Sequence, residues 1–115
     1  MEMARVSDVQ LINDFLKDCE LRKMSKHSVE SYGSTLTIFK KFVERKGYDL
    51  CSIDKKILQE NIKYFQRNDL SYKTMQNRFS TYISFYDYLY DRISKKNEIL
   101  PLHSIIQIKM KYGYG

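Results

Sequence analysis

The hydrophobic residues of this chain recur at intervals of three and four in four successive segments. The first segment begins after Ser7, which has the spacing of a helix capping box with Gln10. Its apolar positions are Val9, Leu11, Ile12, Phe15, Leu16 and Cys19. We therefore expect a first helix from about Asp8 to about Glu20.

The second segment opens with Ser25, a residue type that is common at the N-cap of a helix. The apolar face that follows consists of Val29, Tyr32, Leu36, Phe39 and Val43. Gly47 is a natural residue just beyond a helix end, so this helix should finish near Lys46.

The third segment has two competing N-caps, Ser52 and Asp54, and ends in the polar stretch 66–69. Its buried stripe is expected to contain Ile57, Leu58, Ile62 and Phe65. This pattern predicts a third, shorter helix.

The fourth segment has the strongest periodicity. It opens with Ser71, a small hydroxyl residue that can cap a helix, and the helix that follows should extend to about Ile93. Its narrow apolar arc consists of Met75, Phe79, Tyr82, Tyr86 and Leu89. No long alternation of apolar and polar residues precedes residue 94, so we predict an all-α bundle of four main helices. One core should join the four stripes, including Phe15, Leu36, Phe39, Ile62, Phe79, Tyr82 and Tyr86.

The composition is that of a small ordered domain. The chain has 115 residues, of which 43% are hydrophobic and 30% charged, with one Pro and four Gly. We expect residues 1–97 to form the helical domain and residues 98–115 to form a C-terminal linker, because the pattern changes after Ser94.

Nothing in the sequence points to a metal, a cofactor or a membrane. Cys19 and Cys51 lack metal-ligand spacing, and we interpret both as core or core-edge residues. The polar N-terminus has no secretory h-region, and no apolar run is long enough to span a bilayer. We therefore expect a cytoplasmic protein that binds no cofactor.

A strip of hydrogen-bond donors lies opposite the apolar arc of the fourth segment. A helical wheel places Lys73, Asn77, Ser80 and Ser84 on the far side, with Thr74, Arg78 and Thr81 along one flank. The strip contains no carboxylate between residues 70 and 86, whereas an ordinary solvated face mixes both charge signs. With a net charge of +6, this strip suggests contact with DNA phosphates and base edges.

The start of the second segment is another candidate DNA surface. Lys26, His27, Ser28 and Ser31 lie in or beside the first helical turn, whose free N–H groups attract phosphate. Two alternatives stay open: Ser28 can simply help to cap its own helix, and His27 can be an ordinary exposed histidine. Tyr32 lies on the apolar face, so its ring should pack in the core.

Two spaced motifs give the chain its resemblance to a known family. The first is Ser25-x-x-Ser28-x-x-x-Tyr32, and the second runs from Leu70-Ser71-x-x-Thr74 through Arg78 and Ser80 to Phe85-Tyr86-x-x-Leu89. Together they resemble the core-binding domain of tyrosine recombinases, the phage-integrase and Xer-like family. The resemblance covers roughly residues 15–97.

The resemblance implies a module that grips double-stranded DNA with its second and fourth helices. In that family these helices form half of a C-shaped clamp whose other half is the catalytic domain, and other recombinase protomers on the DNA are further candidate partners. Two departures affect individual contacts. Ile83 stands where the family often has a basic residue, and Asn97 is followed by Glu98, with Pro101 displaced.

We expect no enzymatic activity from this chain alone. Family members cut DNA with an Arg/His/Lys set and a tyrosine nucleophile, but neither His27 nor His103 has an Arg three residues later. One alternative function is a stand-alone DNA-binding protein without catalytic activity. Another is a helical protein-interaction module, with exposed aromatic residues as the contact surface. Candidates for that surface are Tyr72, Tyr88, Tyr90, Tyr112 and Tyr114.

Overall fold

The structure, a computed structural model, describes the backbone of residues 7–93 and the side chains of residues 7–89. It contains four helices, α1 (Asp8–Leu21), α2 (Lys26–Arg45), α3 (Lys55–Arg67) and α4 (Tyr72–Ile93). No strand occurs within these described residues. The predicted all-α bundle is confirmed, and each helix lies where its apolar stripe predicted it. The expected linker 98–115 lies outside the described part of the chain.

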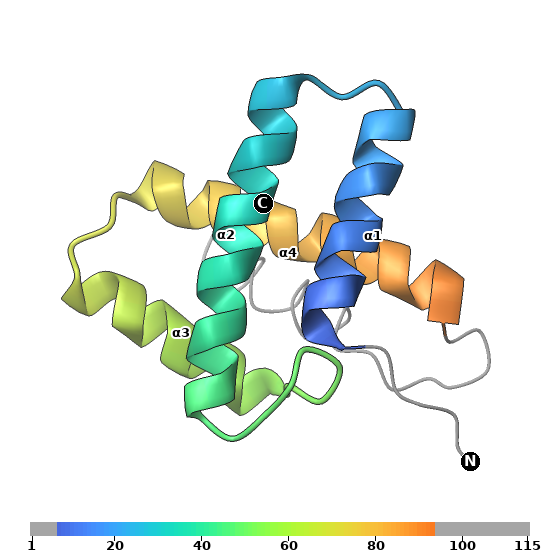
Figure 1. Cartoon of the computed structure of the whole chain (residues 1–115). Helices are drawn as coiled ribbons and strands as arrows, with labels where there is room; N and C mark the ends of the chain where they lie inside the picture. Colours follow the sequence, from blue (N-terminus) through green and yellow to red (C-terminus); the bar gives the residue numbers. More distant parts are fainter. Residues whose placement is uncertain (1–6, 94–115) are drawn as a thin grey trace, which may run out of the picture.

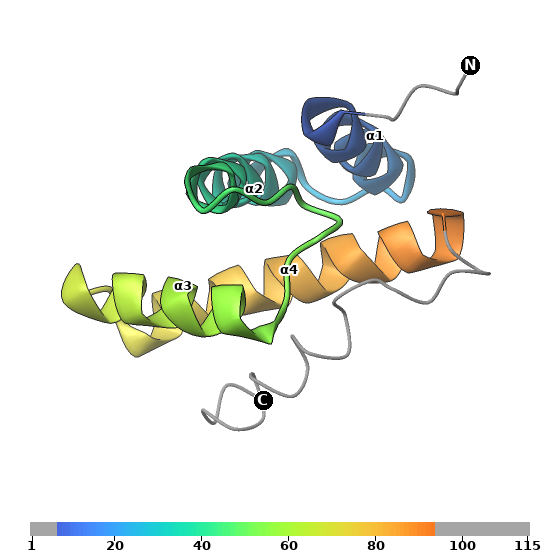
Figure 2. The same ribbon diagram turned by 90° about the horizontal axis from the view of Figure 1, so that it is seen from below.

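The helices are arranged in two layers. α1 and α2 form an antiparallel pair, and α4 crosses beneath both of them (Figures 1 and 2). α3 lies in the same layer as α4, so that the second layer is also made of two helices (Figure 2). α4 touches both members of the first layer, which makes it the central helix of the bundle.

All four helices begin at a side-chain cap. Ser7, Ser25, Asp54 and Ser71 each accept a hydrogen bond, 3.0–3.1 Å long, from the backbone N–H three residues later. Such caps satisfy N–H groups that have no partner inside the helix. These short polar residues therefore fix the start of every helix, as their sequence positions predict.

The structure also decides between alternatives at two of these caps. At α3, Asp54 is the cap, whereas the Ser52 hydroxyl accepts from the Asp49 N–H and donates to the Asp49 carbonyl. At α1, only half of the predicted capping box forms, because the Gln10 side chain donates to Asp14 instead. In both cases a side chain that could have capped the helix bonds to a different group nearby in the sequence.

Three helices end in the same left-handed turn. The residue after each C-cap has positive φ: Lys23 at 66°, Gly47 at 85° and Asp69 at 56°. In each case the next N–H bonds back to a carbonyl five residues earlier, at 3.1–3.2 Å, which defines a Schellman motif. Those next residues, Met24, Tyr48 and Leu70, pack against the core. Of these three turns, only the one at Gly47 was predicted from the sequence.

The core joins all four helices and is rich in aromatic side chains. All seven residues predicted for it are at most 2% exposed, so the prediction is confirmed. Phe39 stacks on Tyr82 with ring centroids 4.2 Å apart, and Phe79 lies 5.1 Å from the same tyrosine. Cys19 is buried and Cys51 is half-buried, and no disulfide joins them.

The connection between α2 and α3 is part of the core. Leu50 is fully buried, and both of its backbone polar groups bond to distant side chains. Its N–H donates to the Asp8 carboxylate at the start of α1 (3.2 Å), and its carbonyl accepts from the Tyr86 hydroxyl of α4. These two bonds attach the connection to both layers of the bundle.

Candidate nucleic-acid interface

The first turn of α2 presents the first group of predicted DNA-binding residues. Lys26, His27 and Ser31 are exposed, as expected for residues that could meet a ligand. Ser28 is half-buried, and its hydroxyl lies 3.0 Å from that of Ser25, the N-cap. Ser28 therefore takes part in capping its own helix, one of the two alternatives that the sequence left open.

The first turns of α4 present the second group. Lys73 and Asn77 are exposed. Thr74 is half-buried, and its hydroxyl accepts a hydrogen bond at 3.0 Å from that of Ser71, the N-cap. The two motifs that begin Ser-x-x-Ser and Ser-x-x-Thr thus form the same local structure, a hydroxyl cap whose second hydroxyl lies beside the first. This capping explains the spacing of both motifs without any ligand.

Two residues predicted on the flank of α4 are less accessible than a helical wheel indicates. Thr81 is only 4% exposed, and its hydroxyl donates to the Asn77 carbonyl one turn earlier (3.2 Å). Its expected place at an accessible flank is therefore wrong. Arg78 is half-buried rather than free of the core, and its Nε is buried. α3 covers this side of α4, because the Arg78 guanidinium lies over the ring of Phe65.

The two helix starts occupy separate positions on the surface. In Figure 1, α2 begins at the top of the molecule and α4 begins at its left edge, so the predicted residues form two groups and not one cluster. A duplex offers phosphates along its whole length. Two separate anchor points are therefore compatible with one extended ligand.

Several basic residues elsewhere are held by carboxylates. Arg22 pairs with Asp18 at 2.9 Å, Lys40 with Glu44 at 2.8 Å, and Lys46 with Glu60 at 3.2 Å. Within residues 7–89, Lys26 and Lys73 belong to no such pair. The positive ends of the α2 and α4 helix dipoles add to their charge, which makes both starts suitable for phosphate.

The aromatic motif residues hold the bundle together. Tyr32 stacks on Phe15 with the ring centroids 5.9 Å apart, and Phe85 meets the same ring edge-on at 5.4 Å. Ile83, which stands where the resemblance leads one to expect a basic residue, is half-buried against the core. These positions join α1, α2 and α4.

The buried tyrosine hydroxyls act as hydrogen-bond donors. Tyr82 donates to the Asn61 side-chain carbonyl at 2.9 Å, and Tyr86 donates to Leu50. Burial raises the pKa of both phenols, and the nearby Arg78 only partly offsets this for Tyr82. The two hydroxyls therefore remain protonated at neutral pH.

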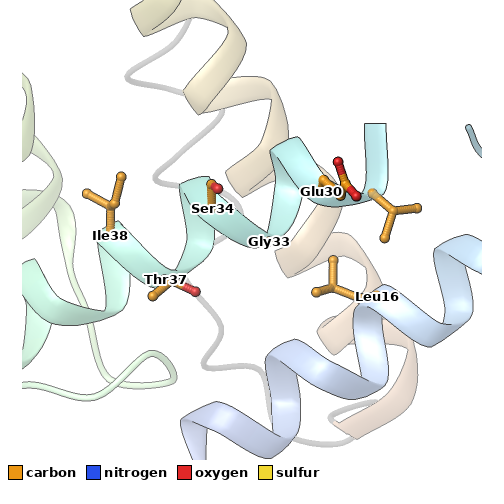
Figure 3. A pocket seen from close by; sticks show the side chains of 7 residues that line it. Leu16, Glu30, Gly33, Ser34, Thr37 and Ile38 are labelled. Atoms are coloured by element: carbon orange, nitrogen blue, oxygen red, sulfur yellow. The ribbon is translucent and has the colours of Figure 1, made fainter. Parts of the chain in front are cut away.

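A shallow groove of about 600 Å³ separates α1 from α2 on the outer face of the first layer. Figure 3 shows Leu16 of α1 facing Gly33 of α2, with Glu30, Thr37 and Ile38 around them. Glu30 is the charged residue of its lining, so the groove is unsuited to phosphate. None of the predicted DNA-binding residues lines it.

Metal coordination and membrane crossing each require a particular arrangement of the described residues. Among them, no three His, Cys, Asp or Glu side chains gather in a way that could hold a metal ion. No helix between residues 7 and 93 combines the length and the apolar character that crossing a bilayer requires.

One family model matches this chain, that of the phage integrase N-terminal SAM-like domain, over residues 12–92. A comparison with curated proteins and one with solved structures gave no match. The matched range runs from the first turns of α1 almost to the end of α4, which is well over half of the chain. It also contains both motifs on which the resemblance rested. The chain therefore belongs to the phage integrase N-terminal SAM-like domain family.

Proposed function

We propose that this chain is the DNA-binding module of a site-specific tyrosine recombinase or integrase, and that it grips the recombination site through α2 and α4. The observation that carries the proposal is the family match, which spans all four helices. The accessible cations at the starts of α2 and α4, Lys26 and Lys73, support it. In this proposal the reaction belongs to a separate catalytic domain, and residues 98–115 lead towards that domain.

The contacts we propose are mainly to phosphate. Lys26, His27, Ser31 and the free N–H groups at the start of α2 would meet one stretch of backbone. Lys73 and Asn77 would meet another stretch from the start of α4, where the Asn77 amide can also reach a base edge. The hydroxyls of Ser28 and Thr74 each accept a hydrogen bond from an N-cap hydroxyl. They would therefore contribute only with the hydrogen-bonding capacity that this contact leaves unused.

The proposal is tested by titrating the protein with a duplex of arbitrary sequence at increasing salt. Contacts to phosphate release counterions, so log K should fall linearly with log salt, and isolated non-specific binding should lie near ~10⁻⁴ to 10⁻⁶ M. Binding that ignores ionic strength, or no binding at low salt, would contradict the proposal.

The alternative, a protein-interaction module, is supported by few of its expected residues. Tyr72 is 52% exposed, as a contact residue should be. Tyr88 instead packs against Phe15, with the two ring centroids 5.4 Å apart. The side chains of Tyr90, Tyr112 and Tyr114 lie outside the described residues. An interface made of aromatic residues would respond little to salt, so the same titration distinguishes the two functions.

A further inference from the structure

Arg78 is held in a way that an ordinary surface arginine is not. Its Cζ lies 5.4 Å from the centroid of the Phe65 ring, which belongs to α3. Its Nε is buried and has no hydrogen-bond partner among the described residues. The guanidinium therefore rests on an aromatic face at the seam between α3 and α4, and it forms no ion pair with a side chain of residues 7–89.

This arrangement leaves a partly desolvated positive charge without an anion. A buried donor that lacks an acceptor lowers stability, and a charge removed from water lowers it further. The Phe65 ring compensates in part, because a cation within about 6 Å of an aromatic centroid is attracted by the ring. An external anion would supply the rest of the compensation. Water would screen its attraction to the half-buried Arg78 less than its attraction to the exposed Lys73.

From this we propose that Arg78 is a preorganised receptor for one backbone phosphate of DNA, and that Phe65 is the positioning residue that holds it. The inference rests on the proposed function and adds the identity of the contacted group. A guanidinium held against α3 cannot extend into a groove, whereas phosphates are the outermost groups of a duplex. The planar fork of arginine suits phosphate oxygens better than the single ammonium of lysine does.

The neighbouring packing explains how Phe65 can fix Arg78. One turn later in α4 and one turn earlier in α3, Asn61 of α3 accepts the hydrogen bond from Tyr82 of α4. Phe65 is 2% exposed and Tyr82 is 1% exposed, so both helices at this seam are anchored in the core. The position of the guanidinium is therefore set by α3 as much as by its own helix.

The test is a double-mutant cycle on binding to a duplex of arbitrary sequence. Arg78→Gln should reduce the salt slope of log K by about 1, the loss of one phosphate contact. Arg78→Lys should keep most of the slope but bind more weakly. Phe65→Leu should weaken binding in the parent protein and have almost no effect in the Arg78→Gln background.

Several outcomes would overturn the inference. If Phe65→Leu weakens binding by the same factor in both backgrounds, its effect is general and Phe65 does not act through Arg78. If Lys73→Gln weakens binding but Arg78→Gln does not, DNA binding stands and the Arg78 site is wrong. Circular dichroism of each variant verifies that it is folded.

A second measurement separates this inference from the proposed function and does not require Phe65→Leu to fold. Inorganic phosphate is added to the parent protein while the Arg78 Nε–H resonance is followed by NMR. Its absence from the spectrum of Arg78→Lys assigns the resonance. A saturable shift of it, at phosphate concentrations that leave the other arginine Nε–H resonances unchanged, supports the site even if the parent binds no duplex. An unchanged resonance together with a normal salt slope in Arg78→Gln refutes it.

Discussion

The Tyr86 hydroxyl donates a hydrogen bond to the backbone carbonyl of Leu50, across 36 residues of sequence. Tyr86 belongs to the Phe-Tyr pair of the second motif, and Leu50 lies in the connection between α2 and α3. Both residues are fully buried, so this carbonyl has no access to water. A residue of the motif on which the family resemblance rests therefore holds a connection inside the core.

We predict that Tyr86→Phe destabilises the fold without affecting DNA binding directly. The substitution leaves the Leu50 carbonyl buried without a donor, which costs about 1–3 kcal/mol. Urea unfolding measures the change. Tyr32→Phe is the matched control, because Tyr32 stacks on Phe15 but is only partly buried. Equal losses in the two variants would mean that the hydrogen bond to Leu50 is unimportant.

A second prediction concerns the pH dependence of stability at Asp8. Burial raises the pKa of this carboxyl above its usual 3.8; the Leu50 N–H opposes that rise, Asp49 and Glu44 add to it, and Lys40 lowers it. The folded state thus binds a proton more tightly than the unfolded state. Asp8 should therefore make stability fall as pH rises from about 3.8 through its raised folded pKa.

Unfolding of the parent and of Asp8→Asn across acidic pH measures this effect. The asparagine oxygen can still accept from the Leu50 N–H but does not titrate. The stability of the parent minus that of the variant should decrease as pH rises through this window. A difference that increases instead would show that the helix dipole and the hydrogen bond outweigh burial.

The proposed DNA contacts are tested by reversing charges at helix starts. Lys26→Glu combined with Lys73→Glu should abolish duplex binding at low salt, because both proposed phosphate anchors become repulsive. Lys55→Glu with Lys56→Glu is the control: all four lysines are exposed, lie in a first helical turn and change the net charge equally. If both double variants lose binding equally, attraction to DNA is diffuse.

The left-handed turn at Lys23 predicts a stabilising substitution. A side chain at φ 66° is strained, whereas glycine adopts this conformation freely. Lys23→Gly should therefore raise the free energy of unfolding by up to ~1 kcal/mol. The reverse change, Gly47→Ala at φ 85°, should lower it by a similar amount. Thermal unfolding reports both, and a loss of stability in Lys23→Gly would contradict this account.

The sequence by itself determined where the helices lie. Caps such as Ser25 and Ser71 bond to N–H groups three residues away, and stripes such as that of α4 repeat every turn. Both are local properties, so they can be read before the fold is known. The same locality explains why the left-handed turns at Lys23 and Asp69 were missed, because no glycine marks them.

Only the tertiary structure decided which flank residues remain accessible. A helical wheel places Arg78 and Thr81 just outside the apolar arc of α4, but it contains no information about neighbouring helices. α4 packs against α1 and α2 and also beside α3, so its buried surface is wider than its apolar stripe. Asp8 and Tyr86 both bond to Leu50, which is distant from each of them in the sequence. Such contacts depend on how the two helix layers pack against each other, and no local sequence pattern specifies that packing.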